Sequence, residues 1–415
     1  MSKLLKKIGL NSRKALSSRI NSKKKNKVLN DFVKLIEINK NKIISENKKD
    51  IFYARKKKLK ENLINRLTLN DDKLKTIANS VRTIISIKDP VNKVTSKWKR
   101  PNGLEIRRVT IPIGVIGVIF ESRPNVTSDV SALCFKSGNA VILRGGSEAF
   151  NSNKILVNLF RKALKKNRVN EDYVQFISNK SRKLVDFLLS KMEDTVDVII
   201  PRGGKSLVKK VKQLSKVPVI GHLEGICHTY IDKEAEDKMA NKIILNAKLR
   251  NTSICGATET LLVHKNKSKS LNLILNSLIE NGCKILADRK IKKVFKGKSY
   301  PANNNTWSKE HLSAIISVKL VNDVKEAVEH INKYGTMHTD AIITKNKNTA
   351  EFFIKNVKSS IAILNSSTQF ADGGEFGFGG EVGISTNNLP PRGPVGLNQL
   401  VTYKYEVYGS GQIRK

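Results

Sequence analysis

The chain opens with amphipathic segments in which apolar residues recur every three or four positions. This spacing holds over residues 28–47 and again over 74–85, and it is the period of a helix with one buried face. A strictly alternating stretch, 104–109, then follows Asn102-Gly103, the dipeptide that most favours a tight hairpin turn. We therefore predict a mostly helical first hundred residues that end in a β-hairpin.

From Ile111 onward, short apolar runs alternate with amphipathic stretches. The runs predict strands at 115–120, 140–143, 174–177, 196–200, 217–220 and 229–231, with helices near 126–137, 148–166, 181–192 and 204–214. Such alternation indicates a parallel sheet covered by helices on both faces. A second series after Asp232 predicts a helix to Arg250 and strands at 259–263, 314–318, 341–344 and 361–364. The fold class is therefore α/β with two domains.

The last segment, residues 401–409, alternates in polarity like an edge strand. No strand follows it in the chain, so it needs a pairing partner from elsewhere.

Composition narrows the class of protein. The chain has 415 residues, 39% of them hydrophobic, and carries 77 Lys and Arg against 36 Asp and Glu, a net charge of +41. A length of this kind fits two or three folded domains. The lysines are spread over most predicted helices, and no zinc finger, basic zipper or RNA-recognition signature accompanies them. A solvated cationic surface is favoured, and a nucleic-acid-binding protein is the alternative that the charge leaves open.

The location of the protein follows from cysteine use and from hydropathy. Four dispersed cysteines do not form a disulfide framework, which indicates a reducing compartment. The longest apolar run, 111–120, is interrupted by Pro and Gly and is too short to span a bilayer. The first 30 residues lack acids, as organelle transit peptides do, but a surface helix is the favoured interpretation. We expect a cytoplasmic protein without a membrane segment.

Two pairs of glycines follow predicted strands and are candidate phosphate-binding turns. Pro201-Arg202-Gly203-Gly204 opens a helix, where backbone N–H groups can meet a phosphate, and Arg144-Gly145-Gly146-Ser147 adds a guanidinium. Either pair alone is more often an ordinary tight turn. The P-loop spacing fails because Ile199 stands where a glycine is required. The glycine-rich stretch 373–381 is either a flexible loop or backbone laid against a substrate.

Cysteine is the best candidate nucleophile. No metal-binding motif and no serine nucleophile elbow is present, so we expect no catalytic metal. Cys255 lies in a polar loop of small residues before a predicted strand, whereas Cys134 and Cys283 have the surroundings of packing residues. Cys227 precedes a strand and stays ambiguous. Spacing alone gives Cys255 a modest lead, because a free cysteine is more often a small buried hydrophobe.

Several longer motifs resemble a known family. Residues 112–126, 138–146, 200–204, 221–228 and 374–394, in this order, are similar to the gamma-glutamyl phosphate reductases, a divergent family of the aldehyde dehydrogenase superfamily. The resemblance runs from residue 12 to 414. It implies NADPH-dependent reduction of L-glutamyl 5-phosphate to L-glutamate 5-semialdehyde and phosphate, the second step of proline biosynthesis. A separate glutamate 5-kinase would supply the acyl phosphate.

The resemblance also implies roles for residues. Cys255 would attack the acyl phosphate and form a thioester, and Asn125 would serve as an oxyanion donor beside the Cys255 amide. The cofactor would be held by Arg144, Gly145, Gly146, Ser147, Pro201, Arg202, Gly203, Gly204 and Glu310. The substrate would be held by Arg123, His222, Asn365, Ser366, Ser367, Thr368 and Gly377.

The domain organisation follows from the same resemblance. A Rossmann-like NADPH-binding domain is expected from 1–93 and 113–225, and an α/β catalytic domain from 226–385. Residues 94–112 and 386–415 would form a small β oligomerisation arm that adds strands to a partner's sheet in a homodimer or higher oligomer. The alternative that keeps this fold is an aldehyde dehydrogenase with a different acyl acceptor.

Overall fold

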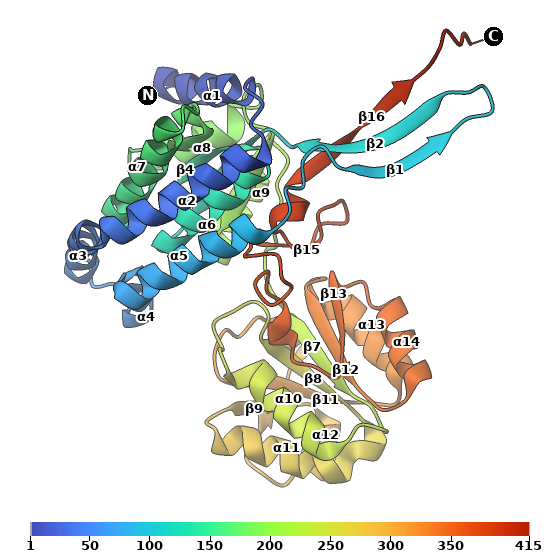
Figure 1. The fold of residues 1–415 in the computed structure, drawn as a ribbon. Coiled ribbons are helices and arrows are strands. Elements are labelled where there is room, and N and C mark those ends of the chain that lie inside the picture. Colours follow the sequence, from blue (N-terminus) through green and yellow to red (C-terminus); the bar gives the residue numbers. More distant parts are fainter. Residues whose placement is uncertain (1, 415) are drawn as a thin grey trace. The chain divides into compact units, whose positions relative to one another are not determined.

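The computed structural model describes residues 2–414 of the chain, which divide into two compact units (Figure 1). Of the described residues, the first comprises 2–221, 377–383 and 395–414, and the second comprises 222–376 and 384–394. The chain therefore passes into the second unit, returns, and makes one further short excursion before its C-terminal strand. Among residues 2–414, no helix is long and apolar enough to cross a bilayer.

The first unit is built on a four-stranded parallel sheet in the order β5-β4-β3-β6. Its strands are β3 (Val115–Phe120), β4 (Ala140–Arg144), β5 (Val174–Phe176) and β6 (Val198–Arg202). The helices are α1 (Ser2–Leu16), α2 (Ser22–Ile38), α3 (Lys40–Lys56), α4 (Glu61–Leu67), α5 (Asp71–Ser86), α6 (Pro124–Lys136), α7 (Phe150–Lys166), α8 (Lys183–Ser190) and α9 (Lys205–Leu214). Side chains from the sheet and from these amphipathic helices form one large apolar core.

A three-stranded antiparallel sheet, which we call the arm, belongs to the same unit. Its order is β1 (Val94–Lys99), β2 (Glu105–Pro112) and β16 (Val401–Tyr408). Figure 1 shows the arm projecting away from the helices of its unit. The hairpin has a five-residue connection, 100–104, in which Gly103 has a φ of +86° that favours glycine. The C-terminal strand, for which no later strand of the chain offers a partner, pairs along its whole length with β2.

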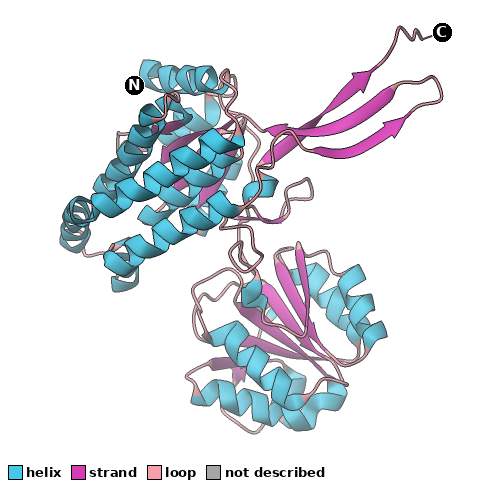
Figure 2. Ribbon diagram, viewed as in Figure 1, coloured by secondary structure: helices cyan, strands magenta, loops and turns pink. Residues whose placement is uncertain are grey.

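The second unit contains a seven-stranded parallel sheet in the order β10-β9-β11-β8-β7-β12-β13 (Figure 2). The strands are β7 (Cys227–Ile231), β8 (Thr258–His264), β9 (Lys284–Ala287), β10 (Tyr300–Pro301), β11 (Ile315–Val321), β12 (Thr339–Ile343) and β13 (Ile361–Leu364). A short antiparallel pair is added by β14 (Ile384–Ser385) and β15 (Gly393–Pro394).

Alternation along the strands of this sheet gives it two apolar faces. Leu261 and Val263 of β8 pack on one face with the helices α10 (Asp237–Leu249), α11 (Ser268–Glu280) and α12 (Arg289–Val294). Leu262, between them, packs on the other face with α13 (Val324–Tyr334) and α14 (Lys347–Asn356). Helices on both faces are what a parallel sheet requires, because both surfaces are apolar.

Short 3₁₀ helices complete the description: η1 (Ser147–Ala149), η2 (Glu171–Tyr173), η3 (Lys265–Lys267), η4 (Asn304–Thr306), η5 (Thr368–Phe370) and η6 (Leu397–Gln399). One strand prediction needs correction, and short strands of the second sheet were missed. Residues 217–220 do not form a strand: Val219 makes only an isolated bridge to Ile199, because Pro218 has no N–H to donate. Strands β9 and β10 were not predicted; both are short, and β10 is only a two-residue strand at the edge of the sheet.

Candidate active site

Cys255 lies in the turn between α10 and β8, directly before the strand begins. β8 is bordered by β7, which starts at Cys227, and β7 is bordered by β12, which starts at Thr339. All three strands are parallel, so their amino ends meet at one edge of the sheet. Residues that immediately precede these strands are therefore brought together although they are far apart in the sequence.

Two histidines lie beside the Cys255 thiol. One ring nitrogen each of His222 and His338 and the Cys255 sulfur all lie within 4.8 Å of one another. The two rings are in edge contact, with centroids 4.8 Å apart. His338 is fully buried, whereas His222 and Cys255 are half-buried.

This arrangement favours a thiolate. Burial by itself would raise the pKa of the Cys255 thiol, but the charge and hydrogen bonding of His338 and His222 outweigh burial and hold the pKa well below its ordinary value. The other cysteines are opposite in character: burial raises the pKa of Cys134 and Cys227, and raises that of Cys283 to about 11. Since the thiolate is the nucleophilic form of cysteine, these surroundings agree with the prediction that Cys255 is the nucleophile, and its catalytic role stays a prediction.

The loop around Cys255 is held from behind by Cys227 and Gly225. The Cys227 thiol donates a hydrogen bond to the Cys255 carbonyl at 3.0 Å, and it also lies 3.6 Å from Nδ1 of His338. A Cβ on Gly225 would stand 2.1 Å from the Cys255 carbonyl oxygen, so no other residue fits there without moving the loop. Cys227, which the sequence left ambiguous, thus contacts both the nucleophile loop and one of its histidines.

Glu310 lies close to the same cluster. Its carboxylate accepts a hydrogen bond from the Gly225 backbone N–H at 2.9 Å. Burial raises the pKa of Glu310, and the negative charge at Cys255 adds to the increase. These contacts place the Glu310 side chain near Cys255, and its cofactor-binding role stays a prediction.

The loop after β13 packs behind Gly256. Thr368 hydrogen-bonds to Thr258 through their hydroxyl groups at 3.0 Å, and its carbonyl oxygen lies 3.2 Å from where a Gly256 Cβ would stand. Asn365 forms a reciprocal amide-to-backbone pair with Thr344. Of the predicted substrate loop, Ser367 caps η5 and Ser366 is half-exposed. This packing supports the position of the nucleophile, and a direct contact with substrate stays a prediction.

Comparisons with known proteins place the chain in a family. The model of the aldehyde dehydrogenase family matches residues 12–281. The chain is 46% identical to a gamma-glutamyl phosphate reductase of Brucella suis, with 95% of this chain and 93% of the relative covered. It is 44% identical to the reductase of Nautilia profundicola over the full length of both chains. The crystal structure of the Thermotoga maritima gamma-glutamyl phosphate reductase is 39% identical, covers 99% of this chain and 100% of its own, and has a TM-score of 0.96.

The chain belongs to the gamma-glutamyl phosphate reductases of the aldehyde dehydrogenase family. The family and the α/β fold predicted from the sequence are confirmed. The nucleic-acid-binding alternative has no support from these relatives.

The predicted phosphate-binding turns lie in the first unit of this family member. Gly204 caps α9, and its N–H is bound by the Glu121 carboxylate at 3.0 Å. A Cβ on Gly203 would stand 2.7 Å from the same carboxyl group. The turn therefore binds a carboxylate of the protein at a helix N-terminus, and its phosphate-binding role stays a prediction. A phosphate placed there would have to displace Glu121.

The arginines of the two turns are engaged with protein groups. Arg144 is buried and donates to the backbone carbonyls of Gly145 and, at 3.1 Å, Lys180. Arg202, which follows Pro201, forms an ion pair with Glu381 at 3.1 Å. The Ser147 hydroxyl donates to Glu148, and a Cβ on Gly146 would stand 2.7 Å from the same carboxylate.

Three other predicted residues also belong to the first unit, whereas Cys255 belongs to the second. Asn125, an exposed residue of α6, donates to the Asp129 carboxylate at 3.2 Å. Arg123 stands at the N-cap of α6. Gly377 has a φ of +72° with open space around its missing side chain. The oxyanion and substrate roles of Asn125, Arg123 and Gly377 stay predictions.

His338 is the site residue that sequence reasoning missed. It belongs to no motif, and only the register of β7, β8 and β12 brings it to Cys255. His222 was expected to touch substrate, and the structure adds a contact with the nucleophile. Met337, just before His338, has a φ of +58°, which is rare for a non-glycine residue. No sequence pattern indicates this backbone conformation.

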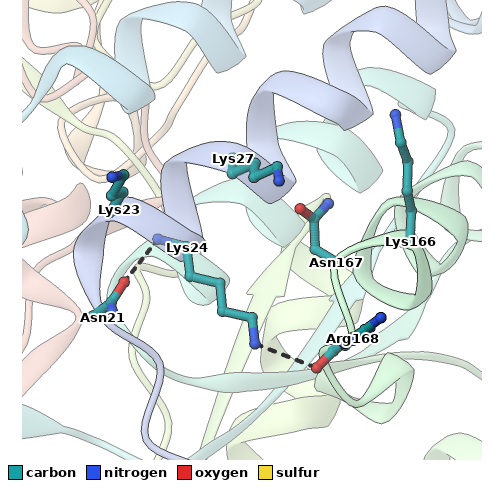
Figure 3. Close-up of a pocket in the computed structure, with 7 residues that line it drawn as sticks. All are labelled: Asn21, Lys23, Lys24, Lys27, Lys166, Asn167 and Arg168. Atoms are coloured by element: carbon teal, nitrogen blue, oxygen red, sulfur yellow. Dashed lines mark hydrogen bonds between the residues drawn. The ribbon is translucent and has the colours of Figure 1, made fainter.

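A basic hollow in the first unit is separate from these residues. It has a volume of about 370 Å³ and is lined by Asn21, Lys23, Lys24, Lys27, Lys166, Asn167 and Arg168. Figure 3 shows Lys24 reaching across it to the Arg168 backbone carbonyl, 3.5 Å away. None of its lining residues was predicted to act in catalysis or binding, so it forms part of the cationic surface and not of the candidate site.

Proposed function

We propose that this chain catalyses the NADPH-dependent reduction of L-glutamyl 5-phosphate to L-glutamate 5-semialdehyde and phosphate, the second step of proline biosynthesis. The observation that carries the proposal is the half-buried Cys255 sulfur with two imidazole nitrogens within 4.8 Å. An acyl phosphate is an activated carboxyl group, and a thiolate is the nucleophile best suited to displace its phosphate at neutral pH.

The reaction begins at the Cys255 thiolate. Its sulfur attacks the 5-carbonyl carbon, the tetrahedral oxyanion collapses, and the carbon–oxygen bond to phosphate breaks, which leaves a thioester. The oxyanion needs hydrogen-bond donors; we assign one to the Cys255 backbone N–H and a second to Asn125. His338 and His222 keep the sulfur ionised before attack and at product release, when the thiohemiacetal expels the aldehyde.

NADPH, when bound, supplies the hydride that converts the thioester to the aldehyde level. Membership in the aldehyde dehydrogenase family supports a nicotinamide dinucleotide, and NADPH is the form we propose. The residues of the first unit fit such a group: the Gly204 N–H at the start of α9 already holds a carboxylate oxygen, and Gly203 leaves no room for a side chain. The two glycine turns, with Arg144 and Ser147, are assigned to its phosphates, and Glu310 to its nicotinamide ribose.

The remaining assignments rest on the same proposal. Residues 1–93 and 113–225 would bind NADPH, and 226–385 would carry catalysis. The free main-chain groups on the outer sides of β1 and β16 support a homo-oligomer formed by strand addition through the arm. A separate glutamate 5-kinase would deliver the acyl phosphate. Four free cysteines support a cytoplasmic location.

The experiment is the reverse reaction of the purified chain. With pyrroline-5-carboxylate, the cyclised form of glutamate 5-semialdehyde, and NADP, formation of NADPH should depend on inorganic phosphate, because phosphate is the acceptor of the acyl group. Coenzyme A and water serve as control acceptors. NADPH formation at the same rate without phosphate would reject the proposed acyl phosphate chemistry and favour a different acceptor.

A further inference from the structure

We propose that His222, Cys255 and His338 form a binding site for a borderline-soft divalent cation, for which Zn²⁺ is the probe, and that the cation reversibly blocks the nucleophile. Only the blocking rests on the proposed function. The binding is a property of the three side chains and can be measured without substrate or cofactor.

The separations of the ligand atoms fit a tetrahedral ion. Zn–S bonds of about 2.3 Å and Zn–N bonds of about 2.0–2.1 Å place neighbouring ligand atoms roughly 3.3–3.6 Å apart. The three atoms here already lie within 4.8 Å of one another, so an ion needs them to close by roughly 1.5 Å at most. Small side-chain rotations achieve this, because Cys255 lies in a loop and His222 is half-buried.

The surroundings of His222 are those of a metal-ligating histidine. Its Nδ1 lies 2.8 Å from the backbone carbonyl oxygen of Ile384, to which it can only donate a proton. That hydrogen bond fixes the tautomer in which Nε2 keeps its lone pair. Ligating histidines almost always donate the second ring N–H to a carbonyl or carboxylate in this way, which orients the ring and increases its basicity.

A second observation in favour of a metal ion comes from His338. The side chain is fully buried, and apart from the interaction of its ring with the Cys255 thiol its Nε2 has no hydrogen-bond partner among residues 2–414. Its other ring nitrogen contacts the Thr339 hydroxyl at 2.9 Å and the Cys227 thiol at 3.6 Å. A buried polar atom without a partner costs free energy, and a metal ion would satisfy it. Three protein ligands leave a fourth position for water, the pattern of an open zinc site.

The ligand set selects the class of cation. One thiolate and two imidazoles suit Zn²⁺, Cd²⁺ or Co²⁺ and do not suit Mg²⁺ or Ca²⁺, which require oxygen ligands. A thiolate bound to such an ion has its lone pair occupied and cannot attack a carbonyl carbon. The cation therefore competes with substrate and is removed by chelators, which makes the inhibition reversible.

The test titrates Zn²⁺ into the chelator-treated full chain in competition with a chromophoric zinc chelator. We expect one Zn²⁺ per chain that is lost when iodoacetamide blocks Cys255. The substitutions Cys255→Ser, His222→Gln and His338→Gln should each weaken binding by more than roughly tenfold. Cd²⁺ in place of Zn²⁺ should give a thiolate charge-transfer band in the wild type and none in Cys255→Ser. Reductase activity should fall in proportion to Zn²⁺ bound and return with excess chelator.

The matched control is His264→Asn, which removes an imidazole of the same unit. His264 Nδ1 accepts the Asn266 N–H at the start of η3, and asparagine preserves such a cap. This variant should bind Zn²⁺ as the wild type does. Affinity unchanged in both the alkylated chain and Cys255→Ser, or less than one Zn²⁺ bound per chain, would overturn the site. Zn²⁺ binding by a chain without reductase activity would keep the site and reject only the proposed function.

Discussion

The sharpest prediction concerns His338, which no sequence motif indicated. Replacing His338 with Gln removes the imidazole whose charge and hydrogen bond favour the Cys255 thiolate, and keeps a polar side chain of similar size. At 4.8 Å, the upper bound of the separation, two unit charges interact by about 3.5 kcal/mol at an effective dielectric constant of about 20. At about 1.36 kcal/mol for each factor of ten, this corresponds to roughly a 300-fold change in the ratio of thiolate to thiol.

The pKa of Cys255 should therefore rise, and the fraction of thiolate at low pH should fall by about 10- to 300-fold, the lower figure allowing for solvent screening at a half-buried thiol. His222 remains in the variant and continues to favour the thiolate. The sign is unambiguous, because burial alone raises the pKa and the histidines oppose it. The variant should lose activity most at the acid side of the pH profile and recover part of it at high pH.

The assay is the rate of iodoacetamide alkylation of Cys255 between about pH 5 and 10, followed by peptide mass spectrometry. In the wild type, the midpoint of this profile should lie well below the ordinary thiol pKa of about 8.5. His338→Gln should move the midpoint upward, and the control His264→Asn should leave it in place. An unchanged midpoint in a folded His338→Gln variant would refute the thiolate–imidazole pair.

Three further predictions test the surroundings of the site and the two units. Gly225→Ala places a Cβ 2.1 Å from the Cys255 carbonyl and should reduce kcat roughly 100-fold while Tm falls only slightly; an active variant would show that the loop moves freely. In the wild type, Lys248 and Glu259 form a buried ion pair at 2.6 Å. Lys248→Met leaves Glu259 without a counter-charge and should lower the free energy of unfolding in urea by about 3–5 kcal/mol, whereas the double variant with Glu259→Gln should lose less. Burial raises the pKa of Asp129 to about 6, so the contribution of Asp129 to the stability of the wild type should fall as the pH rises from about 4 to 6. Asp129→Asn should therefore raise Tm at pH 7.5 but not at pH 4. Equal gains in Tm at both pH values would contradict this.

The fold was largely predictable because the patterns that define it are local. The strands 115–120 and 361–364 have the bounds expected from their apolar runs, and the helices between strands follow from periodicity. Residues 217–220 read as a strand because apolar residues flank a proline, but the proline lacks the N–H that a ladder requires. The C-terminal strand could not be paired from sequence, since its partner β2 lies some three hundred residues earlier.

The site was predictable only where one loop carries the signal. Cys255 stands among small polar residues before a strand, and its surroundings distinguish it from Cys134 and Cys283. His338 and the contact of Cys227 with the Cys255 carbonyl depend on which strands are neighbours, which is a property of the parallel sheet and not of any local pattern. At Arg144 a local pattern does not determine the contacts of the side chain. Its position after a strand predicts that it binds a phosphate, but in the structure its guanidinium donates to backbone carbonyls.

The most direct test of the central claim is the acyl-enzyme itself. With purified chain, L-glutamyl 5-phosphate and no NADPH, mass spectrometry should detect a glutamyl adduct on Cys255, with phosphate released in equal amount. Cys255→Ser should form no such thioester and should not reduce the substrate when NADPH is added. Normal turnover by Cys255→Ser, or an adduct on another cysteine, would contradict the account.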